Sequence, residues 1–417
     1  MSKRNQLRLF VLLCAVLLGS PLLPWAMGRL PPPYEIAPRW SWLHRLPLAP
    51  ASALLTNLSP FLVLGGLIGG IAATWWGGLA LLIGGISVRR GRWFCHHLCP
   101  TGLLADGLGR LNPRAASRLK TLPNAGPWLL WIALGSALFG YPLFLWMDPL
   151  SLLNGFLGAW RLPMAWSAAA PAFGLIAILA LSAWRPRGWC YRFCPLGALQ
   201  DGLGRIGQRF RKGSYSSKEA SDSGRRKFFA LGSGALAGWA AHQVLPRFRS
   251  GGPVLRPPGA ASESRFNALC ARCGNCLRAC PQKIIHAAGG EAGFDGFLTP
   301  VLRIEPGYCA EYCRECNRVC PTAALRPLSL KEKHRVAIGA ARVHRDRCIA
   351  WAQGEYCMVC DEYCPYKAIG AEEKGGVACP VVDEERCRGC GLCQTVCPGI
   401  GPAIRVEAHP AQRKLAE

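Results

Sequence analysis

Several patterns that mark common enzyme classes are missing from this chain of 417 residues. It has no glycine-rich nucleotide-binding loop and no recognisable nucleophile constellation, so the sequence indicates no substrate chemistry of its own. The C-x2-C-H pattern of covalently attached c-type haem is absent as well. Acidic residues are scarce, 24 against 49 Lys and Arg, and no long apolar run follows residue 245. The second half therefore buries little apolar core, and its folding should depend on bound metal.

The first half contains four apolar segments of about bilayer-spanning length. They lie at residues 9–28, 61–88, 127–147 and 164–184. A cleaved signal peptide is the alternative for the first segment, but no convincing A-x-A site follows it, which favours an uncleaved anchor. The sequence thus predicts an α-helical polytopic membrane domain with four or five transmembrane helices.

The formal charge of +25 follows these apolar segments along the chain. The N-terminal tail and the segments 89–124 and 185–227 contain 21 Lys and Arg, whereas the segments 28–60 and 148–163 contain four. By the positive-inside rule, this asymmetry predicts a protein of the bacterial inner membrane whose N-terminus faces the cytoplasm. Because orientation explains the basic excess, we expect no nucleic-acid partner.

Seventeen of the 22 cysteines lie after residue 269, in a spacing unlike that of a secreted disulfide scaffold. Four groups each end in Cys-Pro and follow the C-x2-C-x2-C-x3-C-P run of bacterial ferredoxins, with a longer first gap in the second and third groups. We number these groups motifs 1 to 4: Cys270, Cys273, Cys276 and Cys280; Cys309, Cys313, Cys316 and Cys320; Cys348, Cys357, Cys360 and Cys364; Cys387, Cys390, Cys393 and Cys397.

The four motifs predict four 4Fe-4S clusters. Short gaps aim three thiolates inward from one tight loop, and in two-cluster ferredoxins the last cysteine of each run binds the partner cluster. The spacing leaves open whether motif 1 pairs with motif 2 and 3 with 4, or 1 with 4 and 2 with 3. Zinc is the alternative metal, but four triple-cysteine runs ending in Cys-Pro argue against it. Cys14 and Cys379 fall outside the motifs and are predicted to be ordinary small side chains.

An internal repeat supplies four more cysteines. The segment Cys95–Arg110 reads CHHLCPTGLLADGLGR and Cys190–Arg205 reads CYRFCPLGALQDGLGR, with ten identities in sixteen positions. We call these segments the C-x3-C-P repeats and expect them at the same membrane face. Their cysteines can together hold one further iron–sulfur centre, with zinc as an open alternative and a cytoplasmic disulfide disfavoured; they are Cys95, Cys99, Cys190 and Cys194.

The segment between the repeats and the ferredoxin-type motifs contains an export-like pattern. Arg225 and Arg226 precede Phe228, Phe229 and a weakly apolar run, as in a twin-arginine signal placed internally. Export would make residues 228–245 a fifth span and the back half periplasmic; a basic patch followed by an amphipathic helix is the alternative.

These patterns divide the chain into three parts. Residues 1–212 form the predicted membrane domain, and residues 213–263 hold the export-like segment and a Pro/Gly-rich linker. Residues 264–417 are predicted to form an α+β ferredoxin-like domain around four clusters.

The whole pattern resembles two known families. Paired C-x3-C-P motifs after apolar segments resemble the NapH/MauN-type membrane ferredoxin proteins. The segments FNALCARCGNCLRACP, CAEYCRECNRVCP and CIAWAQGEYCMVCDEYCP resemble the NapG/MauM-type ferredoxins, and RRKFF stands where those proteins have a twin-arginine signal. The chain thus resembles a fusion of both types, although residues 206–224 lack the cytoplasmic ferredoxin pair that NapH-type proteins usually carry.

The resemblance implies a membrane-bound electron-transfer subunit without a substrate of its own. It implies electrons from the quinol pool and a periplasmic reductase, oxidase or cytochrome as partner. The alternative is a maturation or assembly factor for a periplasmic redox metalloenzyme. A redox-sensing regulator ranks last, because no effector domain is visible.

Overall fold

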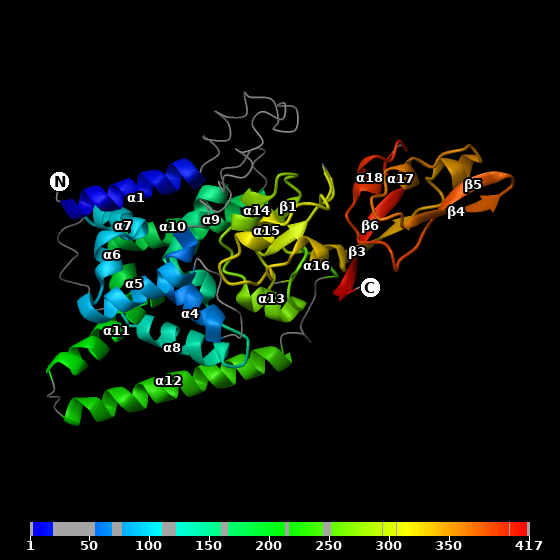
Figure 1. Cartoon of the computed structure of the whole chain (residues 1–417). Coiled ribbons are helices and arrows are strands. Elements are labelled where there is room, and N and C mark those ends of the chain that lie inside the picture. Colours follow the sequence, from blue (N-terminus) through cyan, green and yellow to red (C-terminus); the bar gives the residue numbers. More distant parts are fainter. Residues whose placement is uncertain are drawn as a thin grey trace. The chain divides into compact units, whose positions relative to one another are not determined.

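The computed structural model of the chain describes residues 3–19, 55–68, 77–110, 122–159, 166–212, 217–244, 252–293, 295–305, 307–399 and 401–414. The chain divides into two compact units (Figure 1). The helical unit comprises Met1–Phe248 with the short pieces Asn267–Asn275 and Pro321–Ala323. The cysteine-rich unit comprises Arg249–Phe266, Cys276–Cys320 and Ala324–Glu417.

In its described part, the helical unit consists of helices. In chain order they are α1 (Lys3–Gly19), α4 (Pro60–Ile68), α5 (Gly77–Arg90), α6 (Trp93–His97), α7 (Pro100–Gly109), α8 (Gly126–Ala137), η4 (Leu145–Met147), α9 (Pro149–Ala159), α10 (Trp166–Trp184), η5 (Trp189–Phe193), α11 (Pro195–Lys212) and α12 (Ser217–Val244). The long helix α12 runs along α8 (Figure 1), and glycines at the crossing, Gly135 on α8 and Gly234 on α12, let the two backbones approach closely.

The predicted membrane architecture is wrong for the part of the chain that the structure describes. None of its helices combines the length and the apolar character that crossing a bilayer requires. The segment predicted as a span at 127–147 breaks after Ala137, because the chain turns at Gly140 and at Phe144, whose φ angles are 71° and 65°. The segment 61–88 contributes two separate helices, α4 and α5, on either side of residues 69–76, which lie outside the described ranges.

The predicted segment 164–184 nearly coincides with α10, Trp166–Trp184, whereas two other predicted spans differ from the observed helices. Helix α1 ends at Gly19, and residues 20–28 lie outside the described part of the chain, as do residues 245–251 of the predicted linker. The proposed fifth span, 228–245, is the second half of α12, which begins in a polar, charged stretch at Ser217. Apolar composition alone therefore overestimated helix length here.

The cysteine-rich unit and the segment that leads into it contain short helices and strands. They are α13 (Glu263–Leu269), α14 (Asn275–Ala279), β1 (Ile285–Ala287), β2 (Pro300–Leu302), α15 (Glu315–Arg318), α16 (Leu330–His334), β3 (Val336–Val343), η7 (Ile349–Gln353), α17 (Val359–Glu362), β4 (Ile369–Lys374), β5 (Val377–Val382), α18 (Leu392–Thr395) and β6 (Ile404–Lys414). The strands form three antiparallel pairs, β1 with β2, β3 with β6 and β4 with β5.

The four motifs share one local plan. The third cysteine of each motif lies on a helix of about one turn, and these helices are α14, α15, α17 and α18. The fourth cysteine follows that helix and precedes a proline, which cannot continue a helix and turns the chain away. The short helix and the turn together present the cysteines of one motif from a single compact loop.

Candidate iron–sulfur centres

Motif 2 lines a cavity of about 350 Å³ in the cysteine-rich unit. Its first three cysteines, Cys309, Cys313 and Cys316, lie around this cavity. The fourth sulfur at the wall comes from motif 1, because Cys280 lines the same cavity. Four cysteines from two motifs thus surround one space, as in a two-cluster ferredoxin.

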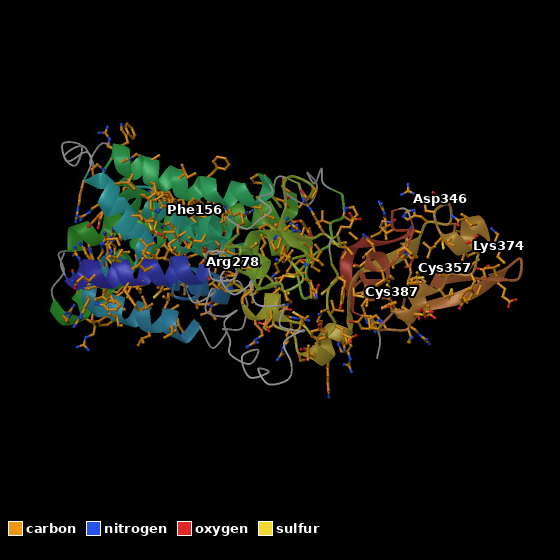
Figure 2. The ribbon with its side chains drawn as sticks, turned by 90° about the horizontal axis from the view of Figure 1, so that it is seen from above. Phe156, Arg278, Asp346, Cys357, Lys374 and Cys387 are labelled. Atoms are coloured by element: carbon orange, nitrogen blue, oxygen red, sulfur yellow. The ribbon has the colours of Figure 1, made fainter. Side chains whose placement is uncertain are left out.

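Motifs 3 and 4 exchange their last cysteines. A cavity of about 390 Å³ is lined by the first three cysteines of motif 3 together with Cys397 of motif 4. A second cavity, of about 340 Å³, is lined by the first three cysteines of motif 4 together with Cys364 of motif 3. Cys357 and Cys387, labelled in Figure 2, mark the two loops. The structure therefore pairs motif 3 with motif 4 and motif 1 with motif 2, a choice that the spacing left open.

These cavities suit a cluster better than a single ion. In the described ranges, no three His, Cys, Asp or Glu side chains converge closely enough to hold one metal ion. In motifs 2, 3 and 4 the cysteines instead line cavities, with four sulfurs from two motifs around each. Four soft sulfur donors around one cavity are the donor set that a 4Fe-4S cluster requires. Of the remaining motif 1 cysteines, Cys270 and Cys273 are buried and Cys276 is half-buried.

In motifs 2, 3 and 4 a backbone N–H group donates a hydrogen bond to the sulfur of the last cysteine. The N–H groups of Ala368 and Ala403 donate to the sulfurs of Cys364 and Cys397 at 3.3 Å. In motif 2 the N–H group of Leu325 donates to Cys320 Sγ at 3.4 Å. Such bonds favour the thiolate form that binds iron. These donors lie four to six residues after the cysteine and belong to no sequence pattern.

Motif 2 and motif 4 meet directly. The backbone N–H of Cys309 donates to the carbonyl oxygen of Cys390 at 2.8 Å. Next to this bond, Gly391 has a φ angle of 87°, and a Cβ added there would lie 2.5 Å from Ile304 Cγ2. A glycine is needed both for the left-handed backbone and for this close approach. The loop of motif 2 is therefore in contact with the loop of motif 4.

The helical unit brings the two C-x3-C-P repeats together around a fourth cavity, of about 530 Å³. Its lining includes all four predicted cysteines, Cys95, Cys99, Cys190 and Cys194. Cys99 and Cys194 each stand immediately before a helix, α7 or α11, that opens with proline. The four cysteines of the two repeats thus line one cavity.

Reciprocal ion pairs join the two repeats. Arg92 lies three residues before the first cysteine of one repeat, and its guanidinium contacts Asp201 of the other repeat at 2.5 Å. The equivalent pair runs the opposite way, from Arg187 to Asp106 at 2.7 Å. Both acids stand eleven residues after the first cysteine of their repeat. The repeats are thus held as a pair in an approximately two-fold arrangement.

The symmetry is broken at the sulfurs. The side-chain amide of Gln200 donates to Cys95 Sγ at 3.3 Å, whereas the equivalent residue of the first repeat is Ala105. Arg8 of α1 is buried and donates to the carbonyl oxygen of Cys99 at 3.3 Å as well as to Asp106. Sequence reasoning missed both residues, because Gln200 lies inside the second C-x3-C-P repeat without being a cysteine and Arg8 lies outside both repeats.

Burial disfavours the thiolate form of the four cysteines around this cavity. Burial raises the pKa of Cys99 to about 11 and that of Cys190 to about 12, and burial also raises the pKa values of Cys95 and Cys194. Without a metal these thiols therefore remain neutral at pH 7, and iron would supply the positive charge that deprotonates them. Of the neighbouring histidines, His96 lines the cavity and His97 contacts the carbonyl oxygen of Trp93 through Nδ1.

Cys379, which lies outside the four motifs, has the surroundings of a structural side chain. It is completely buried between β4 and η7, and its thiol donates to the carbonyl oxygen of Ala350 at 3.5 Å. It packs against Trp351 in a small apolar cluster.

Comparison with known families supports iron–sulfur binding in both units. The family described as 4Fe-4S dicluster domain matches residues 269–324, and two families described as 4Fe-4S binding domain match residues 72–118 with 167–213 and residues 380–399. The chain therefore carries several 4Fe-4S binding domains, which confirms the predicted type of cofactor. No solved structure shows a significant similarity.

Named relatives match the part that contains the ferredoxin-type motifs. The methylamine utilization ferredoxin-type protein MauM of Methylophilus methylotrophus is 38% identical over 162 residues, which are 37% of this chain and 70% of that protein. The ferredoxin-type protein NapG of Escherichia coli (strain K12) is 34% identical over 201 residues, 44% of this chain and 85% of that protein. These two relatives do not show the resemblance of the first half to NapH/MauN-type proteins. The chain covers more than two thirds of both relatives at more than 30% identity. It therefore belongs to the NapG/MauM family of ferredoxin-type proteins.

Proposed function

We propose that the chain is an electron relay that passes single electrons between redox partner proteins through clusters held by motifs 1 to 4. The observation that carries this proposal is the exchange of Cys364 and Cys397 between the cavities of motifs 3 and 4. Such an exchange places the two clusters of a pair side by side, which suits electron transfer rather than substrate conversion. When bound, each cluster supplies one-electron redox chemistry.

The cavities assign the ligands. Motif 2 binds its cluster with Cys309, Cys313, Cys316 and Cys280. By the reciprocal rule of two-cluster ferredoxins, the first three cysteines of motif 1 share their cluster with Cys320. Motifs 3 and 4 exchange Cys364 and Cys397 in the same way.

The order of the clusters follows from the contact between Cys309 and Cys390. This hydrogen bond joins the loop of motif 2 to that of motif 4. The cluster pair of motifs 1 and 2 therefore meets the cluster pair of motifs 3 and 4 where motif 2 contacts motif 4. We assign the order 1, 2, 4, 3 to the electron path, which differs from the order along the sequence.

A fifth centre belongs to the same proposal. Cys95, Cys99, Cys190 and Cys194 surround one cavity, and the matching family is described as a 4Fe-4S binding domain. The backbone N–H groups of Gly102 and Gly197 donate to Cys99 and Cys194 at 3.4 Å, as expected for sulfurs prepared to bind iron. These four residues would hold one further iron–sulfur centre.

The partners and the location extend the proposal. We assign the quinol pool as electron source and a periplasmic reductase, oxidase or cytochrome as acceptor, with the cysteine-rich unit on the periplasmic side of the bacterial inner membrane. The resemblance to periplasmic ferredoxins and the Arg225-Arg226 pair before Phe228 support this assignment.

The test is an iron and acid-labile sulfide count on the anaerobically purified full chain, with EPR before and after addition of a reduced quinol analogue. The expected result is about sixteen irons from motifs 1 to 4 and about twenty with the fifth centre, at four irons per cluster. Cluster signals that appear on quinol addition would support the quinol source. Fewer than about half of these irons would overturn the relay itself.

A further inference from the structure

A lysine is buried beside the cysteines of motif 2. Lys333 is 5% exposed, and its ammonium group donates to the carbonyl oxygens of Ala310 and Cys313 in the motif 2 loop. Both acceptors are neutral. In the described part of the chain, no carboxylate forms an ion pair with Lys333.

The position of Lys333 is fixed by the sequence around it. Helix α16 begins with a complete capping box, in which Ser329 Oγ accepts from the N–H of Glu332 at 3.1 Å and the Glu332 carboxylate accepts from the N–H of Ser329 at 2.7 Å. This cap sets the start of the short helix and so sets which side chains face inward. Lys333 faces the motif 2 loop, whereas Lys331, Glu332 and His334 of the same helix are exposed.

A buried ammonium is costly unless an anion compensates it. Two carbonyl dipoles satisfy its hydrogen bonds but do not neutralise its charge. A 4Fe-4S cluster bound by four thiolates carries net negative charge, and the cavity of motif 2 adjoins the two carbonyls that Lys333 contacts. The missing counter-charge is thus the cluster that this loop binds.

The charge of Lys333 lies at motif 2, because its ammonium group contacts backbone carbonyl oxygens within that loop. The basic residues that line the cavities of motifs 3 and 4, Arg347 and Arg388, are more accessible to solvent than Lys333, which weakens their effect.

We propose that Lys333 is the internal counter-ion of the cluster held by motif 2 and raises its reduction potential. The inference rests on the proposed relay. Reduction adds one electron to the cluster, taken from a neighbouring cluster or from a low-potential reductant, and no bond breaks and no proton moves. A fixed cation nearby stabilises the more negative, reduced form. In the order 1, 2, 4, 3, the second centre then holds its electron more strongly than it would without the lysine.

The test removes the charge and keeps the hydrogen-bond donors. Lys333→Gln retains an amide N–H group that can reach the two carbonyls, and the matched control is Lys331→Gln, an exposed lysine of the same helix. Both variants are purified anaerobically as full chains, and each EPR signal is titrated against potential with dithionite. Cys313→Ser identifies the motif 2 signal. The expected result is at least a tenfold shift of the motif 2 equilibrium toward the oxidised form in Lys333→Gln, about 59 mV downward for a one-electron couple, with no shift in Lys331→Gln.

Other outcomes separate this inference from the relay. Full iron with unchanged potentials in Lys333→Gln overturns the counter-ion role and leaves the relay intact. If Lys333→Gln instead loses about four irons, Lys333→Arg decides: recovered iron supports the counter-ion role, and persistent loss overturns it in favour of a purely structural lysine. A low iron count in the unaltered chain overturns the relay instead.

Discussion

At the scale of single residues, Asp148 is the buried acid whose environment gives a measurable pH dependence. It lies just before α9, is fully buried, and accepts hydrogen bonds from Ser59 Oγ at 2.6 Å and from the N–H groups of Leu150 and Ser151 at 3.1 and 3.0 Å. Burial raises its pKa to about 6, although these hydrogen bonds act in the opposite direction. At neutral pH the folded helical unit therefore holds a carboxylate that would be more stable in water.

The raised pKa predicts that stability falls as pH rises from about 4 to about 6. Over this range the folded state binds more protons than the unfolded state, whose Asp has a lower pKa, so unfolding becomes easier with each step upward in pH. Asp148→Asn should remove this fall, which amounts to roughly 2–3 kcal/mol. Urea midpoints measured by tryptophan fluorescence at pH 4.5 and 7 provide the check, with the exposed Asp346→Asn as control. An unchanged pH dependence in Asp148→Asn would contradict the prediction.

From the sequence, single functional residues could be identified only where they belong to a short pattern with fixed spacing. The sixteen cysteines of motifs 1 to 4 follow a fixed spacing and end in Cys-Pro, so they could be predicted without a structure. Lys333, Gln200 and Arg8 could not be predicted, because each acts on a cysteine that is far from it in the sequence. Their side chains are ordinary surface types, and only burial distinguishes them.

At the scale of elements, the two C-x3-C-P repeats depend on their crossed ion pairs. The side chain of Arg92 is 12% exposed and that of Asp201 is 35% exposed, so solvent screens this pair only partly. Arg92 also donates to the carbonyl oxygen of Cys190 at 2.8 Å, which ties the pair to the cavity. The equivalent pair, Arg187 with Asp106, is shared with Arg8.

A double-mutant cycle should therefore reveal coupling between the repeats. Arg92→Gln is expected to cost about 1–3 kcal/mol, because it leaves a partly buried Asp201 without its partner, and Asp201→Asn should cost much less in the Arg92→Gln background than alone. The exposed pair Arg342 and Glu407, with 64% and 48% exposed side chains, serves as control and should couple by no more than about 1 kcal/mol. Urea midpoints of the four chains give the coupling. Additive effects at Arg92 and Asp201 would mean that the crossed pair does not hold the repeats.

The failure of the predicted spans also belongs to the scale of elements. Residues 127–147 are apolar enough to suggest one helix, yet the chain turns at Gly140 and Phe144, and the buried hydroxyl of Ser136 accepts a hydrogen bond from the N–H of Leu143 at 2.9 Å. Turns inside apolar sequence produce no periodicity or polarity signal, so composition could not locate them. The repeat itself was recognisable in the sequence, because the same pattern occurs twice with equal spacing.

At the scale of the whole molecule, the contact between motifs 2 and 4 is the junction on which the proposed path between the two cluster pairs depends. Cys309 and Cys390 come from loops that are far apart in the sequence, and their hydrogen bond cannot be inferred from either motif. The spacing predicted four clusters but not their order. The order follows from packing, in which Gly391 allows the loop of motif 4 to approach Ile304 beside motif 2.

This packing predicts that Gly391→Ala interrupts electron exchange between the two pairs. The new Cβ would lie 2.5 Å from Ile304 Cγ2, so the Ile304 side chain or the loop of motif 4 has to shift at this junction. Gly354→Ala is the matched control, because Gly354 also has a left-handed backbone, with a φ of 69°, but has no atom within 4 Å of an added Cβ. Both variants carry the backbone strain of about 1–2 kcal/mol, whereas only Gly391→Ala adds the clash.

The measurement is the magnetic interaction between the reduced clusters of motifs 2 and 4, observed by EPR in fully reduced full-length chains. We expect it to weaken in Gly391→Ala, to persist in Gly354→Ala, and to return when Ile304→Ala is added to Gly391→Ala, since the shorter side chain removes the clash. An interaction of full strength in Gly391→Ala, with all irons retained, would show that the two pairs do not exchange electrons through this contact. The order 1, 2, 4, 3 would then be wrong, because the junction between motifs 2 and 4 is the single contact from which that order was assigned.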